Sequence, residues 1–176
     1  MLKVNSQYII GLFLIVNLCV FYSFFAQNIF AEENGKNIFT TWEGFEVDKC
    51  ASIWLITRFI DKNAIIKIIP KGAISTDGVL FDIPEAKFRR TFNRSTYESL
   101  QQYYKLSDPK LIKIGKIVHD VEINTWDKKK YAESRNALEI IHSVIMKTKD
   151  SSEILKISNQ YFDMLYEKID VKDITH

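Results

Sequence analysis

The residues best suited to chemistry lie between Val47 and Asp61, a segment that reads V-D-K-C-A-S-I-W-L-I-T-R-F-I-D. It combines a dense apolar run with six polar residues of kinds that bind ions or exchange protons: Asp48, Lys49, Cys50, Ser52, Arg58 and Asp61. An arginine in so apolar a segment needs either a carboxylate partner or a bound anion. Asp61 is the nearby carboxylate, and the planar guanidinium of Arg58 also suits an oxyanion.

Cys50 has two alternative roles. It follows Lys49 at the start of an expected helix, and both a helix N-terminus and a neighbouring cation stabilise a thiolate, which would make the thiol reactive or metal-binding. Cysteine is also among the residue types most often buried, so a small core residue is the simpler interpretation. The only other cysteine is Cys19, in the N-terminal segment.

A second group of candidates lies in I-V-H-D-V-E, residues 117–122. His119 and Glu122 are three residues apart, so on a helix they project from one side, a spacing known from metal sites in helical bundles. With Glu98 they are the candidate ligands of a divalent metal. The alternatives are an acid/base role of His119 with Glu98 or Asp120, and an ordinary surface histidine.

Several function classes are excluded or disfavoured. The sequence lacks the standard motifs of nucleotide binding, serine hydrolysis and zinc-finger binding. Lysine and arginine (24) nearly balance aspartate and glutamate (22), so charge does not indicate a nucleic-acid partner. A basic cluster interleaved with two phenylalanines is better interpreted as a solvated strand face: Lys87, Phe88, Arg89, Arg90, Phe92 and Arg94.

The N-terminus has the layout of a signal peptide. Lys3 precedes an apolar run from Tyr8 to Phe25, and Ala31 is a suitable cleavage point before an acidic pair. We therefore expect residues 1–31 to be a signal peptide and the protein to be exported, periplasmic or extracellular. The alternative is a membrane anchor formed by residues 8–25, which would be the chain's only contact with a membrane.

The candidate residues must be positioned by the elements around them. Residues 32–41 read as a flexible lead, and the segment that follows reads as extended. Asp48 is a good N-cap for a helix from Lys49 to about Ile60, whose apolar residues cover most of its circumference. Two or three short strands are expected to form a small antiparallel sheet: residues 64–70, 79–82 and, as a third, 87–92.

The rest of the chain is expected to be helical. Ser95 and Glu98 form a capping box, and Asp108 with Pro109 is an N-cap followed by proline at the first helical position. Two further helices, 131–147 and one to about Lys168, would form an antiparallel hairpin. Their expected inward residues are Leu138, Ile141, Ile145, Ile154, Ile157, Tyr161, Met164 and Leu165. The sequence thus predicts an α+β, mainly helical single domain at 42–169 and a frayed tail at 170–176.

Four segments together resemble a known family. The 47–61 segment, Phe81-Asp82-x-Pro84, the Ser95–Glu98 capping box and residues 117–122 occur in the order and spacing of the ChrB C-terminal domain, also called the chromate resistance exported protein family. The resemblance is clear from Trp42 to Glu122 and looser over the C-terminal helices. It carries over these positions: Asp48, Lys49, Ser52, Trp54, Arg58, Asp61, Glu98, His119 and Asp120.

The resemblance implies a link to chromate or oxidative-metal stress. In longer relatives this domain follows another domain and the proteins are described as chromate-responsive regulators; here a signal-like segment stands in that place, so a transcriptional role does not carry over. Many relatives have a histidine near the position of Phe92, so a metal site shared with the family would lack that ligand here.

We therefore expect a protein that binds or senses a small oxyanion or a metal in a pocket formed by the 47–61 helix and the 95–122 helices. The candidate ligand-binding residues are Asp48, Lys49, Ser52, Trp54, Arg58, Asp61 and Glu98. An enzyme that uses His119, and a structural domain without a ligand, are the alternatives. The sequence leaves open the ligand and the oligomeric state.

Overall fold

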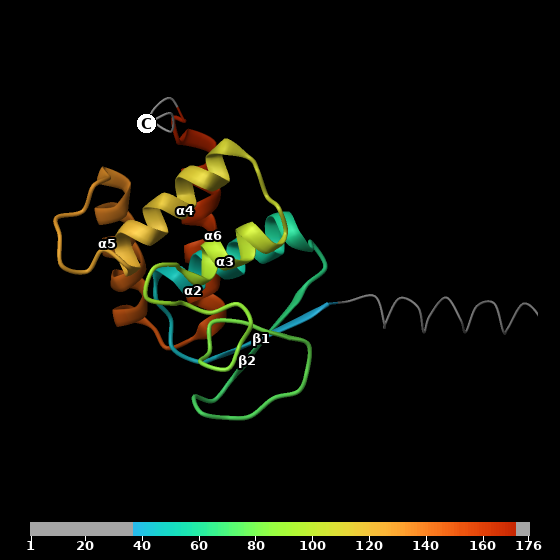
Figure 1. Cartoon of the computed structure of the whole chain (residues 1–176). Coiled ribbons are helices and arrows are strands. Elements are labelled where there is room, and N and C mark those ends of the chain that lie inside the picture. Colours follow the sequence, from blue (N-terminus) through green and yellow to red (C-terminus); the bar gives the residue numbers. More distant parts are fainter. Residues whose placement is uncertain (1–36, 172–176) are drawn as a thin grey trace, which may run out of the picture. The chain divides into compact units, whose positions relative to one another are not determined.

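The computed structural model describes residues 37–171. The expected signal peptide lies outside these residues, as does the end of the expected tail. The elements, in chain order, are β1 (Ile38–Trp42), α2 (Val47–Leu55), a π-helical turn η1 (Ile56–Ile60), β2 (Ile65–Ile69), β3 (Val79–Leu80), α3 (Thr96–Tyr103), α4 (Pro109–Glu122), α5 (Ala132–Lys147) and α6 (Ser151–Lys168) (Figure 1). The α+β, mainly helical class predicted from the sequence is confirmed.

The sheet is parallel, so the predicted antiparallel pairing is wrong. β1 is the central strand between β2 and β3, and it runs parallel to both. The reason is the connection: α2 and η1 return the chain to the start of the sheet, which makes β1 and β2 parallel, as in a β-α-β unit. The predicted third strand, 87–92, contributes only isolated bridges, one of them between Phe81 and Phe88.

The two faces of the sheet have different neighbours. Phe39 of β1 lies opposite Ile66 and Val79, and this row of three packs against the hydrophobic core. On the other face, the loop 70–78 crosses the strands: the Thr40 hydroxyl donates to the Asp77 carbonyl at 2.7 Å, and the Trp42 indole donates to the Ala73 carbonyl at 2.8 Å. This crossing carries the chain from β2 to the far side of β1.

β1 begins within the segment that the sequence indicated as a flexible lead. Its sequence, I-F-T-T-W, consists of β-branched and aromatic residues, and its three middle residues are buried. The strand is short and lacks a clear alternation of polar and apolar residues, because both of its faces are covered. That is why the pattern alone did not identify it.

α2 is the central helix. All nine of its residues are buried, and it contacts α3, α4, α5 and α6. Its N-cap is Glu46, which makes no side-chain cap, so the predicted capping role of Asp48 for this helix is wrong. Trp54 near its end packs against the rings of Phe59, Phe162 and Tyr166 and joins the helix to α6.

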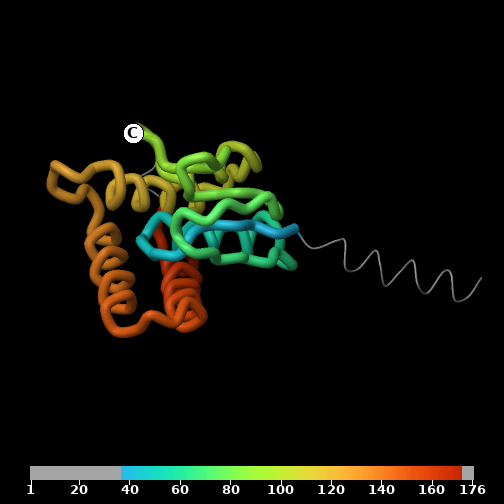
Figure 2. Tube along the Cα trace, turned by 90° about the horizontal axis from the view of Figure 1, so that it is seen from below, coloured from blue at the N-terminus to red at the C-terminus, as the bar shows by residue number. Residues whose placement is uncertain are grey.

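The remaining helices begin where the sequence predicts. The Ser95–Glu98 capping box and the Asp108 cap with Pro109 at the first turn are both present. α5 and α6 pack side by side as the predicted hairpin (Figure 2). Leu138 and Met164, expected inward, are 44% and 46% exposed. The buried face of α5 consists of Ser134, Ala137, Ile141 and Val144, and that of α6 consists of Ile154, Ser158, Tyr161, Phe162 and Leu165. Within residues 37–171, no helix has the combined length and apolarity needed to cross a bilayer.

Gly78, directly before β3, lies where the loop 70–78 packs closely against β1. Its φ is +70°, and a Cβ there would lie 2.1 Å from the Ile38 carbonyl oxygen. Gly72 in the same loop has a φ of +85° but no atom within 4 Å of its Cβ position. We expect Gly78→Ala to lower the free energy of unfolding by about 3 kcal/mol or more, and Gly72→Ala by about 1 kcal/mol from backbone strain alone. Urea unfolding measures both; equal losses would contradict the close approach of Gly78 to β1.

Candidate functional site

The site is organised by Asp48, whose side chain is fully buried. Its two carboxylate oxygens accept the backbone N–H groups of Thr96 and Tyr97 at 2.7 and 2.9 Å. These are the first two N–H groups of α3, and the third, of Glu98, donates to the Ser95 hydroxyl. Asp48 therefore supplies from α2 the negative charge and the acceptors that the N-terminus of α3 needs.

Glu122 does the same for α2. One carboxylate oxygen of this last residue of α4 accepts the backbone N–H of Asp48 at 3.1 Å. α4 thus caps α2, and α2 caps α3, through two successive carboxylates. The three helices are fixed relative to one another at one corner.

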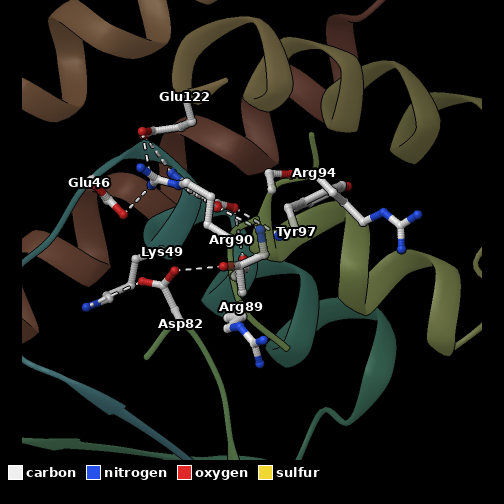
Figure 3. Close-up of polar contacts among 12 residues, drawn as sticks. Glu46, Lys49, Asp82, Arg89, Arg90, Arg94, Tyr97 and Glu122 are labelled. Atoms are coloured by element: carbon white, nitrogen blue, oxygen red, sulfur yellow. Dashed lines mark hydrogen bonds and ion pairs between the residues drawn. The ribbon is translucent and has the colours of Figure 1, made fainter. Parts of the chain in front are cut away.

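Arg90 connects the carboxylates of this corner (Figure 3). Its Nη2 bonds to Glu46 and lies 3.0 Å from an oxygen of Glu122, while its Nε lies 3.6 Å from Asp48. One guanidinium is therefore shared by three carboxylates. The neighbouring Arg89 side chain points away from them in Figure 3.

Lys49 and Asp82 form a second buried pair beside Arg90. The Lys49 ammonium lies 3.5 Å from Asp82 and donates to the Trp42 carbonyl at 2.7 Å, and the two side chains are only 6% and 7% exposed. Asp82 also accepts the Thr96 hydroxyl at 2.7 Å and has a φ of 52°, uncommon for a residue other than glycine. Both charges are held in fixed positions.

Carboxylates outnumber cations in this corner, and the pKa values of three of these carboxylates are raised. Burial, with the nearby charge of Asp82, raises the pKa of Asp48 to about 6, although the two backbone N–H groups and Arg90 lower it. Burial also raises the pKa of Glu46 and of Glu122 above the ordinary value, because the attraction of Arg90 does not offset desolvation.

The first pocket opens on this corner. It has a volume of about 510 Å³. Its charged lining residues are Glu43, Glu46, Lys49, Lys71, Asp82, Arg89 and Arg90. Arg89 donates to the Ala86 carbonyl, and neither Arg89 nor Lys71 has a carboxylate within ion-pair distance among residues 37–171. Glu43 also has no ion-pair partner among these residues, although its carboxylate accepts the Lys71 backbone N–H. The unpaired charges of this pocket are therefore two positive and one negative, which leaves a net positive charge.

A second pocket of about 500 Å³ lies between α3, α4 and the loop that follows α4. His119 Nδ1 and a carboxylate oxygen of Glu98 are 2.9 Å apart in its wall. Asp120 is committed elsewhere: it accepts the Asn124 amide and the backbone N–H groups of Lys130 and Tyr131. Burial pushes the pKa of Asp120 upward, but these bonds outweigh it and hold the pKa below the ordinary value.

The residues of the 47–61 segment point in different directions. Arg58 makes two 3.0 Å bonds to Asp163 of α6, so the expected local partner, Asp61, is wrong. Trp54 donates to the same Asp163 at 2.7 Å. Asp61 instead accepts the Asn37 amide. Asp48, Lys49 and the buried Ser52 lie toward the corner described above.

Cys50 is a core residue. Its side chain is fully buried, and burial raises the pKa of the thiol to about 12. Desolvation thus outweighs the attraction of the neighbouring Lys49, and the thiolate that the helix start suggested does not form at neutral pH.

The structure brings two of the three expected metal ligands together. His119 meets Glu98, whereas Glu122 faces Arg90 and the start of α2. Within the described part of the chain, no group of three His, Cys, Asp or Glu side chains is arranged to hold a metal. Phe92, the position near which the family resemblance implied a histidine, is 93% exposed.

Sequence reasoning missed Glu46 and Arg90. Arg90 was assigned to a solvated strand face, but it is half-buried among carboxylates whose residues lie at least 32 positions away along the chain. No local pattern could have identified such partners. The Phe81-Asp82-x-Pro84 step was the one local signal for Asp82.

This geometry lies within a recognised family domain. The family model described as ChrB, C-terminal domain, matches residues 39–169. The chain belongs to the ChrB C-terminal domain family. The match runs from β1 past the end of α6, so both pockets belong to the ChrB domain, which links the chain to chromate resistance. No curated protein and no solved structure matches the chain.

Asp48→Asn tests the capping role of the buried carboxylate. The asparagine amide would place an N–H donor against the N–H groups at the start of α3 and would remove a partner of Arg90. We expect the free energy of unfolding to fall by about 3 kcal/mol. Asp61→Asn, the same change at a partly exposed position of the same segment that caps no helix, should have a much smaller effect. Similar denaturation curves for the two variants would contradict the role of Asp48.

Proposed function

We propose that this ChrB domain binds a small oxyanion in the first pocket. The observation that carries the proposal is the convergence of four cations on one opening: Lys49, Lys71, Arg89 and Arg90. Chromate is itself a small oxyanion, and the family's link to chromate resistance favours this ligand class. Lysine and arginine are the residues that bind such anions, by charge-assisted hydrogen bonds.

The cations have two kinds of environment, which suggests two roles. Lys49 and Arg90 form part of the pocket wall and are held in place by Asp82 and Glu46. Arg89 and Lys71 are exposed and have no ion-pair partner among the described residues. In the proposal, the exposed pair attracts and contacts the anion, and the fixed pair provides N–H donors held in position in the wall.

The pocket differs in part from the one expected from the sequence. Asp48 and Ser52 support its wall from behind, and Trp54, Arg58 and Asp61 lie outside its lining. A metal is the weaker choice for this pocket, because two of its three carboxylates, Glu46 and Asp82, are already paired with cations and only Glu43 is not. The oxyanion proposal therefore rests on Arg89 and Lys71, which the sequence did not single out as a site.

The proposal places the domain outside the cytoplasm, on the basis of the signal-like N-terminal sequence. The proposal includes no nucleic-acid partner, because the basic residues between Lys87 and Arg94 do not form one continuous surface. Lys87 lies over the Tyr103 ring at 3.6 Å, and Arg90 is enclosed by carboxylates. A domain without a ligand is the alternative that the following experiment distinguishes.

Titration calorimetry of the full chain with chromate and with sulfate, in a mild detergent, tests the site. We expect binding to the wild type and a loss of about fivefold in affinity for Arg89→Gln, because one exposed charge-assisted contact is removed. Arg94→Gln is the matched control, since Arg94 is exposed and lies outside this pocket's lining. Absence of binding, or equal losses in the two variants, would refute the proposal.

The affinity for sulfate, which stays a dianion across the neutral and mildly acidic range, should rise as the pH falls. The pKa of Glu46 lies above its ordinary value because of burial and of Glu122. Below that pKa, Glu46 is neutral, so it repels the anion less and releases Arg90 to the pocket. Glu46→Gln should bind more tightly at neutral pH and show a flatter pH profile. A wild-type affinity that falls on acidification would contradict the competition between Glu46 and the anion.

A further inference from the structure

We propose that the second pocket is a separate binding site for a small anion that carries a dissociable proton, with His119 as the proton acceptor. The pocket has a volume of about 500 Å³. Its lining residues are Glu98, Lys116, His119, Asp120, Ile123, Asn124, Lys130 and Tyr131. None of them lines the first pocket, so this site does not depend on the proposed oxyanion site.

The His119 ring is oriented by Glu98. The same Glu98 oxygen that lies 2.9 Å from His119 Nδ1 accepts the Ser95 backbone N–H at 2.8 Å and the Ser95 hydroxyl at 3.0 Å. The carboxylate is therefore fixed by the capping box of α3, and it acts as an acceptor. In the neutral form of the ring, Nδ1 then carries the hydrogen, and the lone pair of Nε2 is a free acceptor.

The uncommitted charges of the pocket are positive. Lys116 precedes His119 by three residues on α4, and Lys130 comes from the loop after α4. No hydrogen bond or ion pair joins either ammonium group to another residue within 37–171. Asp120 would be their natural partner, but three N–H donors already occupy its carboxylate, two of them from the backbone of Lys130 and Tyr131.

This set of groups selects the chemical class of the ligand. A tightly held metal would need further ligands beside His119 and Glu98, and the described residues provide none in a suitable arrangement. Two ammonium groups favour an anion, and Nε2 favours one with an O–H group. The ligand donates that O–H to Nε2 and its proton passes to the ring, with no other bond formed or broken. Glu98 then stabilises the imidazolium, and Lys116 and Lys130 stabilise the ligand's added charge.

Nuclear magnetic resonance of the imidazole groups in the full chain, titrated with inorganic phosphate at neutral pH, reads this site directly. We expect His119 to show the Nδ1–H tautomer without phosphate and to shift toward the imidazolium form as phosphate is added. The exposed His142 on α5 is an internal control and should not shift. A His119 signal that moves no more than that of His142 would overturn the proposal.

Two pairs of variants extend the test. Lys130→Gln should weaken phosphate binding at His119 by about threefold to tenfold, whereas Lys128→Gln, in the same loop but outside the lining, should not. Glu98→Gln should remove the tautomer preference of His119. Arg89→Gln, which weakens binding in the first pocket, should leave the His119 titration unchanged, so failure of either site can be recognised separately. Equal effects of Lys128→Gln and Lys130→Gln would show that phosphate is attracted by non-specific charge alone, and this result would overturn the proposal.

Discussion

The buried carboxylate of Asp48 is the interaction on which the arrangement of the helices depends. A charge without access to water is unfavourable unless donors surround it, and burial raises the pKa of this group to about 6. The donors are the first two N–H groups of α3, which belong to the backbone and cannot rotate away. α3 must therefore begin beside α2. The Glu122 carboxylate is paired in the same way with the backbone N–H of Asp48 at the start of α2, and this bond positions α4.

Both candidate sites derive their rigidity from this corner. Thr96 and Tyr97 donate their N–H groups to Asp48, and Glu98, in the next position of the same turn, holds His119. On the other side, Thr96 donates its hydroxyl to Asp82, which holds Lys49. The first turn of α3 thus supports both pockets. The unpaired cations proposed to contact ligands belong to other elements: Lys71 and Arg89 in the first pocket, and Lys116 and Lys130 in the second.

Much of the fold was predictable because its signals are local. Capping residues and proline located the starts of α3 and α4, and an isoleucine-rich run located β2. The direction of the strands was not predictable, because it depends on the α2 crossover and on a loop that crosses the sheet. The Glu98–His119 pair was expected from the sequence and is present, since both residues are on well-defined helices. Arg90 was missed because its partners Glu46 and Glu122 lie far from it in sequence.

The segment from Val47 to Asp61, which carries the family resemblance most clearly, serves mainly to hold the domain together. Asp48 caps α3, and Trp54 and Arg58 share Asp163 of α6, so these residues join α2 to helices that follow much later in the chain. Changes there would alter stability and binding together. Arg89 and His119 lie at the pocket walls with fewer structural partners, so changes there separate binding from folding. The 47–61 part of the family signature therefore identifies mainly the scaffold, whereas the proposed binding residues lie both within the signature, as His119 does, and outside it, as Arg89 does.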